Sequence, residues 1–279
     1  MSEAISPLGY TLEEGEHQGP GSGQCVVFVH GFPDGPSVWD MSAEHLIKQG
    51  YRVVRVTLPG FDNEDIDPSP IHFGLLVERL YQTLDESDAL GATLIGHDWG
   101  AIFLYQLLRR YPHAAGRLIT LEIGAGPRTP WLALFVFLYH ALLILIYQLG
   151  PKWGDKLMER LCASLPRPAY ANPPRPKAKH GWLYRQAWRE GSEEGPWPFY
   201  YRNLIAKWRP SPEVPVLFLY GEESPRLFRF HSKAWRDALC ETSPKHQAQA
   251  LPGKHWFFLE HVDAFHAALD LFLSQDPDK

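Results

Sequence analysis

Short apolar runs rich in β-branched residues alternate along most of the chain with longer segments of helical period. The runs predict strands, and the periodic segments predict helices that pack through one apolar face. We expect strands at 25–30, 52–58, 92–97, 117–123, 214–221 and 246–251, and helices at 38–49, 73–88, 99–111, 232–240 and 261–274. This alternation predicts an α/β fold with a mostly parallel sheet flanked by helices. A hairpin is expected before the first of these strands, within 9–24.

The alternation stops between residues 125 and 212, where no strand pattern occurs. This stretch holds a long apolar helix, a second helical segment at 154–165, and Pro- and Trp-rich sequence at 166–198. Both of its ends are Pro-rich junctions, which are typical of domain boundaries. We therefore predict a core formed by 1–124 and 213–279, with a helical cap at 125–212 inserted between two strands.

The apolar helix at 131–149 is the one segment that challenges a plain soluble interpretation. Only His140 and Gln148 are clearly polar among its 19 residues, a length close to the roughly 20 residues that span a bilayer. Polar, globular-looking sequence lies on both sides, and a span here would place the two halves of one domain in different compartments. We expect a helix buried within the protein, with contact to a membrane surface as the alternative and a true span less favoured still.

Charge and cysteine content exclude several classes of protein. The net charge is −5 and the basic residues are scattered, so a nucleic-acid surface is not expected. Three cysteines, an odd number without metal-ligand spacing, indicate neither a disulfide framework nor a zinc site, and reduced cytoplasmic thiols are the default: Cys25, Cys162 and Cys240. The acidic N-terminus lacks the basic region and apolar core of a signal peptide. We expect no metal and no cofactor.

Residues 93–101, "TLIGHDWGA", have the outline of a sharp turn between a strand and a helix. The small residues around Asp98 permit a strained turn that points its side chain outward. At a helix N-terminus, free N–H groups and the helix dipole favour the ionised carboxylate, which is a competent nucleophile toward carbon. The simpler alternative is an Asp that only caps the helix.

Two further segments carry candidate chemistry. The loop His30-Gly31-Phe32-Pro33 follows the first strong strand, and its main-chain N–H groups are candidate hydrogen-bond donors. His255 lies in "LPGKHWFFLEH", between the last strand and the last helix. From such a loop a general base can reach a nucleophile across the sheet. With 13 histidines in the chain, an ordinary surface histidine is the alternative for His255.

The motifs "HGFP", "LPGF", "GHDWG" and "GKHWFFLEH", in this order and spacing, resemble the Asp-nucleophile branch of the α/β-hydrolase fold. That branch includes epoxide hydrolases and haloalkane dehalogenases, and the resemblance covers roughly 25–124 and 213–274. It implies the α/β-hydrolase fold, with Asp98 as nucleophile and His255 as base. It also implies an oxyanion hole formed by the main-chain N–H groups of Phe32 and Trp99.

The third member of the triad is where the sequence departs from the family. Many members carry an Asp after the strand that follows the cap, in a Gly-x-x-Asp pattern, but "YGEESP" places Ser224 there. Other members place the acid after the preceding strand, and "LITLEIG" offers Glu122, 24 residues after Asp98. We favour Glu122 as the acid, with Glu223 as the alternative.

The leaving group distinguishes the subfamilies. An epoxide opens to an alkoxide, which needs a proton that the family supplies from cap tyrosines. The stretch "PFYYRNLIAKW" resembles the family's Tyr-Arg-Asn segment and points to Tyr201, with Tyr147 or Tyr139 as its partner. A halide needs N–H donors instead. Phe32 stands where many dehalogenases carry Asn, which counts against a halide, although Trp99 could pair with a cap tryptophan: Trp131, Trp182, Trp188 or Trp197.

The sequence therefore predicts a hydrolase that converts a small hydrophobic epoxide into a vicinal diol through an Asp98 ester. Two alternatives remain open. One is a haloalkane dehalogenase with the same Asp-His-acid triad, and the other is a catalytically silent homologue that keeps the fold and a ligand pocket.

Overall fold

The centre of the fold is a seven-stranded sheet in the order β1-β3-β2-β4-β5-β6-β7. The computed structural model describes residues 6–15, 18–61, 71–124, 129–194, 211–225 and 229–275. All neighbouring strands are parallel except β1 and β3. The strands are β1 Gly9–Glu13, β2 Cys25–Val29, β3 Arg52–Thr57, β4 Ala92–His97, β5 Ala115–Leu121, β6 Val216–Gly221 and β7 His246–Leu251.

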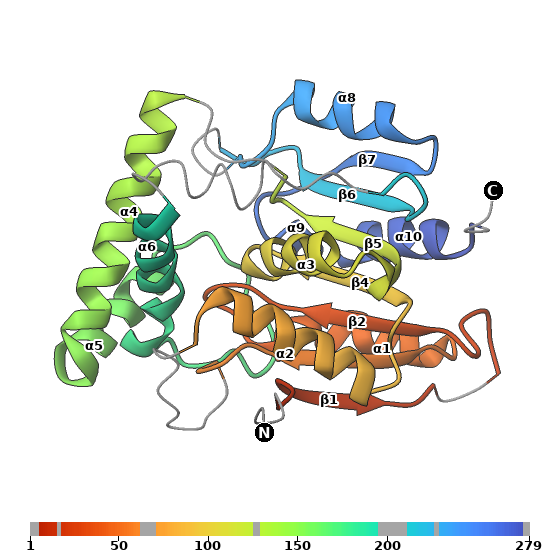
Figure 1. Cartoon of the computed structure of the whole chain (residues 1–279), viewed down its shortest axis with the longest axis horizontal. Helices are drawn as coiled ribbons and strands as arrows, with labels where there is room; N and C mark the ends of the chain where they lie inside the picture. The colour runs from red at the N-terminus through yellow and green to blue at the C-terminus, as the bar shows by residue number, and fades with distance from the viewer. Residues whose placement is uncertain are drawn as a thin grey trace.

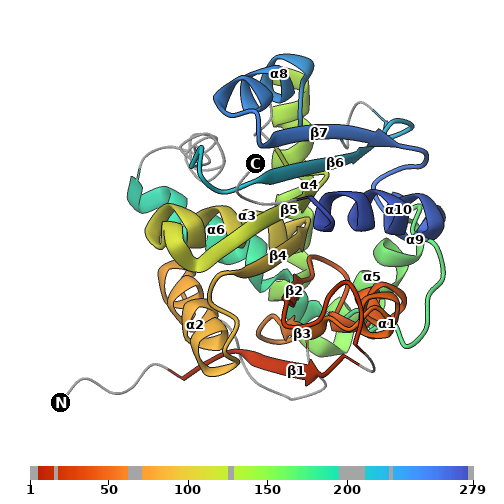
Figure 2. The same cartoon turned by 90° about the vertical axis from the view of Figure 1, so that its right-hand side faces the viewer.

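Helices cover both faces of this sheet (Figures 1 and 2). One apolar cluster joins the sheet to α2, α3 and α8, and a second joins it to α1, α9 and α10. Strand β4 is buried along its whole length, as expected for a parallel strand covered on both sides. The core helices are α1 Asp40–Lys48, α2 Phe73–Glu86, α3 Trp99–Arg110, α8 Lys233–Thr242, α9 Phe257–Glu260 and α10 Val262–Leu273.

The pattern of the sequence predicted this core well. All six predicted strands and all five predicted helices are present within a few residues of their expected bounds, so the predicted α/β fold class is confirmed. The prediction of an N-terminal hairpin is wrong. Strand β1 instead pairs antiparallel with the distant β3, with Tyr10 opposite Val56, and the Gly-rich residues 18–24 form turns that lead into β2. Glycines in a turn offer little side-chain area for a second strand to pack.

In the described part of the chain between β5 and β6, three helices of 13 residues or more lie at one end of the sheet (Figure 1). They are α4 Pro130–Gln148, α5 Gly150–Ala163 and α6 Trp182–Glu194, and we call residues 129–194 the cap. The indole N–H of Trp182 donates to the carbonyl of Pro59 at 2.9 Å, which ties the cap to the loop after β3. The cap thus faces the carboxyl ends of the strands, where ligands bind in open α/β sheets.

Helix α4 is not buried as its sequence predicted. Only Val136, His140, Leu143 and Ile146 are buried among its 19 residues, and Figure 1 shows it along the outer edge of the cap. Its inner side packs on α5, α6 and the short helix Ala178–Gly181. Its opposite side carries exposed leucines. In the described part of the chain, α4 is the one helix long and apolar enough to cross a bilayer.

Candidate active site

Asp98 occupies a strained turn between β4 and α3, with φ 52° and ψ −120°. The turn requires glycine at its close contacts, because a Cβ on Gly100 would lie 2.1 Å from the carbonyl oxygen of Val29 and one on Gly31 would lie 2.5 Å from the Asp98 Cβ. The Asp98 side chain does not make the N-cap hydrogen bond, which would come from the second or third N–H of α3. The capping alternative is therefore wrong.

Two main-chain donors hold the Asp98 carboxylate. The N–H of Phe32 donates to Oδ1 at 2.9 Å, and the N–H of Trp99 also hydrogen-bonds to the carboxylate. Burial raises the pKa of Asp98, while the charge of His255 and these two N–H groups oppose the rise. The structure thus brings together Asp98, the predicted nucleophile, and the two main-chain donors that the resemblance implied. One carboxylate oxygen is fixed, and the other faces His255.

His255 lies between two carboxylates, in the loop that joins β7 to α9. Its Nε2 is 3.9 Å from Asp98 Oδ2, and its Nδ1 is 3.7 Å from Glu122 Oε2. Both separations exceed a hydrogen bond, and a small movement of the imidazole closes either one. On the main chain, the His255 carbonyl accepts from His97 Nε2 at 3.0 Å, which anchors the loop to the end of β4.

Glu122 follows β5 directly and is fully buried, with a positive φ of 68°. Its Oε1 accepts from the N–H of Gly221 at 2.5 Å, and the Ser224 hydroxyl lies 3.3 Å from each carboxylate oxygen. These contacts hold the Glu122 carboxylate in place beside the His255 ring. Glu223 is exposed, and only its main-chain N–H is held, by the carbonyl of Gly253 at 3.0 Å. Of the two predicted acids, the structure brings Glu122 to the imidazole.

The protonation of His255 reflects competing effects. Burial lowers the pKa of the imidazole, whereas the interaction with Glu122 and the charge of Asp98 raise it, and the net shift is upward. The neighbouring His97 experiences the opposite balance, because burial and the charge of His255 hold its pKa well below the ordinary value. His97 is therefore neutral, and of the two imidazoles His255 is the one that takes up a proton more readily.

A pocket of about 70 Å³ opens beside Asp98 between the core and the cap. Its walls are mainly apolar, and its polar groups are Asp98, His255, Tyr139, His140 and Tyr184. Pockets for drug-sized ligands occupy roughly 300–1,000 Å³, so this space accepts a reacting group and little more. A larger substrate must extend past the pocket or displace side chains of the cap.

The cap tyrosines differ in whether they line the pocket. Tyr139 lines the pocket, whereas Tyr147 does not and lies against Arg185, whose guanidinium carbon is 5.5 Å from its ring centre. Tyr201 lies outside the described residues. Tyr184, which sequence reasoning missed, also lines the pocket and is 4% exposed. It is the single tyrosine of the amphipathic segment 182–194, and this placement on the buried side of α6 was the available signal.

Tyr139 and Tyr184 form a pair over the nucleophile. Their ring centres lie 5.8 Å apart and their side chains are hydrogen-bonded. The Tyr184 ring also packs edge-on against Phe32 at 5.2 Å and Trp99 at 5.4 Å. Burial, and then the charge of Asp98, raise the pKa of Tyr139. Its hydroxyl therefore keeps its proton and is available as a donor.

The cap tryptophans considered as halide donors lie elsewhere. Trp182 donates its indole N–H to Pro59, Trp131 is 78% exposed, and Trp188 stacks on Phe137 with ring centres 5.2 Å apart. None of these three lines the pocket, and Trp197 lies outside the described residues.

A buried carboxylate connects the site to the cap. Asp34 is fully buried and accepts from Arg167 at 2.7 Å, from the hydroxyl of Tyr170 at 2.9 Å and from the indole of Trp256 at 2.8 Å. Trp256 directly follows His255, and Arg167 and Tyr170 belong to the cap. Asp34 thus joins the loop after β2, the loop of the base and the cap. Its role was not evident from the sequence.

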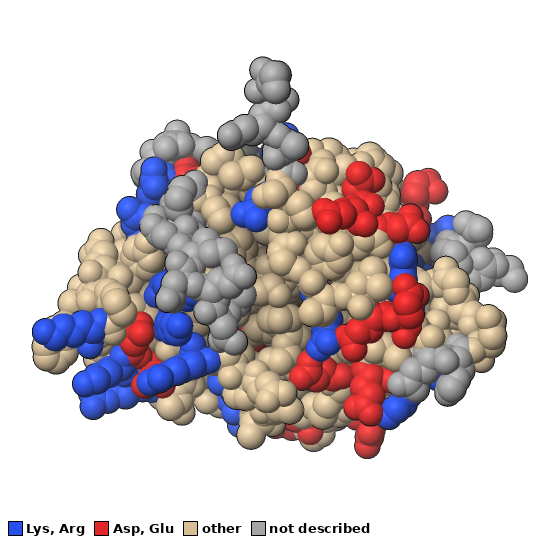
Figure 3. All heavy atoms as spheres, turned by 90° about the horizontal axis from the view of Figure 1, so that it is seen from below, with Lys and Arg blue, Asp and Glu red and all other residues tan. Residues whose placement is uncertain are grey.

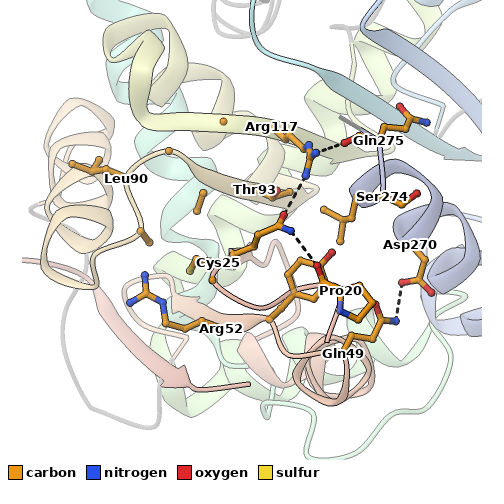
Figure 4. Close-up of a pocket in the computed structure, with 18 of the residues that line it drawn as sticks. Pro20, Cys25, Gln49, Arg52, Leu90, Thr93, Arg117, Asp270, Ser274 and Gln275 are labelled. Carbon is orange, nitrogen blue, oxygen red and sulfur yellow. Dashed lines mark hydrogen bonds between the residues drawn. The ribbon is translucent and has the colours of Figure 1, made fainter. Parts of the chain in front are cut away.

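A larger hollow of about 1080 Å³ lies at the opposite ends of the strands, around Cys25, Thr93 and Arg117 (Figure 4). Arg117 is engaged there, since its guanidinium donates to the main-chain carbonyl of Gln275 and approaches the side chain of Gln24 at 3.5 Å. The hollow contains none of the predicted site residues. The predicted residues Asp98, His255 and Tyr139 line the smaller pocket instead.

Relatives of known name share part of this sequence. Epoxide hydrolase 2 of Siraitia grosvenorii is 34% identical over 125 residues, which cover 44% of this chain and 39% of that protein. Bifunctional epoxide hydrolase 2 of Sus scrofa is 28% identical over 112 residues, covering 39% of this chain and 20% of that protein. The chain thus matches about two fifths or less of the length of these relatives.

Solved structures and the family comparison address the fold. A provisionally assigned epoxide hydrolase from Klebsiella pneumoniae has a TM-score of 0.67 at 18% identity, covering 95% of this chain and 94% of that one. A thermophilic esterase from Thermogutta terrifontis has a TM-score of 0.62 at 18% identity, covering 95% and 92%. The model of the alpha/beta hydrolase family matches residues 26–268. Because this match runs from the first parallel strand into the last helix, the chain belongs to the α/β hydrolase family.

Proposed function

We propose that the protein is an epoxide hydrolase whose Asp98 forms an ester with the substrate. One observation carries the proposal: Asp98 has one oxygen held by Phe32 and the other facing His255, beneath the Tyr139–Tyr184 pair. The named relatives that are epoxide hydrolases add support. The apolar walls of the pocket favour a small hydrophobic epoxide as substrate.

In the first step, Asp98 Oδ2 attacks one carbon of the epoxide and the ring C–O bond breaks. The oxygen leaves as an alkoxide and takes a proton from a cap tyrosine, so the products are a hydroxy ester and a tyrosinate. Tyr139 and Tyr184 are the described candidates for this donor. Hydrogen bonding to the developing alkoxide lowers the barrier because the charge forms within reach of a fixed donor.

In the second step, His255 Nε2 takes a proton from water, and the resulting hydroxide attacks the Asp98 carbonyl carbon. The negative charge that develops on Oδ1 lies at the main-chain N–H groups of Phe32 and Trp99. The bond between the carbonyl carbon and Oδ2 then breaks, and the leaving alkoxide takes the proton from His255. The regenerated carboxylic acid returns its proton to the tyrosinate, which completes the cycle.

The charge of Asp98 coordinates these two steps. It is one of the effects that raise the pKa of His255, and esterification removes it. The pKa of the imidazole therefore falls when the ester forms, and the neutral base appears at the step that requires it. Glu122 retains its charge throughout and orients the Nδ1–H of the ring.

Dehalogenation is less well supported by the pocket. A departing halide needs N–H donors, and the indole N–H groups of Trp182 and Trp256 are already donated to Pro59 and Asp34.

We assign the enzyme to the cytoplasm, because the three cysteines are free thiols, as is usual in reducing compartments.

A single turnover in heavy-oxygen water tests the ester mechanism. Excess enzyme is mixed with an aryl or alkyl epoxide, and the diol and the Asp98 peptide are analysed by mass spectrometry, with a haloalkane and halide release measured in parallel. We expect the label in the Asp98 peptide and not in the first-turnover diol. Label found only in the diol would exclude the ester.

The matched variants are Asp98→Asn and Asp88→Asn. Asp88 is also an aspartate with positive φ, but its side chain is 99% exposed and it lines the hollow at the opposite ends of the strands. Asp98→Asn should abolish turnover of every epoxide, and Asp88→Asn should retain it. Binding of epoxide without turnover by the wild-type protein would identify a silent ligand-binding homologue instead.

A further inference from the structure

The outer side of α4 carries a continuous apolar stripe. Its residues recur at spacings of three and four, which places them on one face of the helix: Trp131, Leu134, Leu138, Leu142, Leu145 and Leu149. The exposed fraction ranges from 40% at Leu149 to 78% at Trp131. Contiguous exposed apolar surface of this kind marks an interaction site. Helix α5 extends it with Trp153, 60% exposed, and Leu157, 39% exposed.

Basic side chains border this stripe. Lys152, Lys156 and Arg160 are exposed on α5, and no ion pair involves any of them in the described part of the chain. The two acidic residues of α5 are engaged: Asp155 accepts from the main-chain N–H of Ala178 at 2.7 Å, and Glu159 pairs with Arg175 at 2.5 Å. Helix α4 itself has no charged residue. The surface therefore combines apolar area with a positive border.

Basic and acidic side chains are separated on the face of the molecule that Figure 3 shows. In Figure 3, Lys and Arg gather at the end that holds the cap, and Asp and Glu gather over the opposite, core end. The chain as a whole carries −5, so its basic end is a local exception. A protein with this polarity is oriented by a negatively charged surface, which attracts the cap and repels the core.

The inner side of α4 reaches the pocket. Phe135, Val136, Tyr139 and His140 line it, and the stripe lies on the opposite side of the same helix. One helix thus separates the pocket at Asp98 from the outer apolar surface.

We propose that the cap binds peripherally to the surface of an anionic phospholipid bilayer. The apolar stripe enters the boundary between headgroups and acyl chains, and Lys152, Lys156 and Arg160 contact lipid phosphates. Exposed Trp131 and Trp153 have the amphipathic side chain that is enriched at this boundary. A second copy of the chain fits less well, because it presents the same basic border, and both acidic residues of α5 are already engaged. Binding to lipid does not depend on the proposed reaction.

Vesicle flotation of the full chain tests this proposal. The vesicles are phosphatidylcholine alone, or phosphatidylcholine with about 30% phosphatidylglycerol. We expect binding to the anionic vesicles to be about a hundredfold tighter, since each of the three basic side chains near such a surface contributes about 1 kcal/mol, or roughly a fivefold factor. Raising the ionic strength to about 0.5 M should weaken it. Equal binding to both vesicles, or binding to neither, would overturn the proposal.

Two matched pairs of variants separate the stripe from general surface effects. Leu138→Gln, in the stripe and 57% exposed, should lower the partition coefficient about tenfold, while Leu271→Gln, on α10 and 62% exposed, should not change it. Lys156→Glu should weaken binding, and Lys233→Glu, on α8, should not. Thermal midpoints close to wild type confirm folding. A Leu138-dependent dimer in sedimentation velocity, without vesicle binding, would assign the stripe to a second copy and contradict the proposal.

Discussion

The Ser224 hydroxyl lies 3.3 Å from both carboxylate oxygens of Glu122. These residues follow two adjacent parallel strands, β6 and β5. Position 224, where the resemblance led us to expect an acid, is thus in contact with Glu122, the acid that we favoured instead. The two positions at which an acid was expected are far apart in sequence and meet in space, and Glu122 is the one whose carboxylate lies 3.7 Å from His255. We therefore propose that Glu122 takes the role for which the resemblance led us to expect an Asp at position 224.

Glu122→Gln should slow turnover about a thousandfold, because the amide keeps the shape of the side chain but cannot stabilise the imidazolium. Ester hydrolysis should suffer most, so mass spectrometry of quenched enzyme should show the Asp98 ester accumulating. Glu223→Gln is the control and should behave like wild type. Loss of turnover in the control with normal activity in Glu122→Gln would move the role to Glu223.

Restoring an acid at position 224 should rescue the Glu122→Gln variant. We expect Glu122→Gln/Ser224→Asp to turn over at least about tenfold faster than Glu122→Gln, because the new carboxylate lies next to the position of the one that was removed. Ser224→Asp alone should be impaired, since two carboxylates in one buried site oppose each other's ionisation. Steady-state kinetics of the three variants checks this. No recovery in the double variant would show that the serine and glutamate positions are not interchangeable.

The pH dependence of ester hydrolysis should follow His255. Below its pKa the imidazole is protonated and cannot accept a proton from water, so hydrolysis should slow as the pH falls. Glu122 and Asp98 raise this pKa in the free enzyme, and the ester removes the charge of Asp98. The acid limb of single-turnover hydrolysis should therefore lie at lower pH than the His255 titration followed by NMR in the free enzyme.

The same titration in Asp98→Asn provides the control for that comparison, because the pKa of His255 should fall when the carboxylate is neutralised. An unchanged titration would show that the charge of Asp98 does not act on the imidazole.

The cap tyrosines should differ in their contribution to epoxide opening. Tyr139→Phe and Tyr184→Phe should each slow ester formation about ten- to hundredfold, because each removes a hydroxyl that lines the pocket. Tyr147→Phe should be close to wild type, since its ring lies against Arg185. Rapid-quench measurement of the ester gives these rates directly. A defect in Tyr147→Phe alone would place the proton donor elsewhere.

Arg167→Met should destabilise the fold by about 3–5 kcal/mol, because it removes the cation from the fully buried Asp34. Asp34→Asn/Arg167→Met should be less destabilised than the single variant, since the buried charge is then absent. Arg175→Met, which breaks an exposed pair with Glu159, should cost less than about 1 kcal/mol. Urea denaturation measures all three. Equal costs for the two single arginine variants would contradict the buried-pair interpretation.

Local signals account for what could be predicted. The strands follow from runs of β-branched residues, and Asp98, Phe32 and Trp99 follow from motifs whose members lie next to a strand end. The features that were missed depend on packing between distant segments. The pairing of β1 with β3, the placement of Tyr184 over Phe32 and the partners of Asp34 join residues far apart in the chain.

The position of α4 illustrates the same limit. Its composition is compatible with both burial and lipid contact, and we expected burial; only the packing of the cap shows which residues remain exposed. The choice between Glu122 and Glu223 could be predicted only in part from the sequence. Spacing favoured Glu122, but the contact with His255 required the fold.

The backbone at Gly31 passes so close to Asp98 that even a methyl group would collide with its Cβ. The loop after β2 and the turn after β4 are therefore in direct contact and joined by the hydrogen bond from Phe32, so separating them would break both interactions. Flexibility that admits a substrate has to come from the other wall of the pocket. Evolution of a new substrate range in this chain would accordingly alter α4 and α6 and leave the turn at Asp98 unchanged.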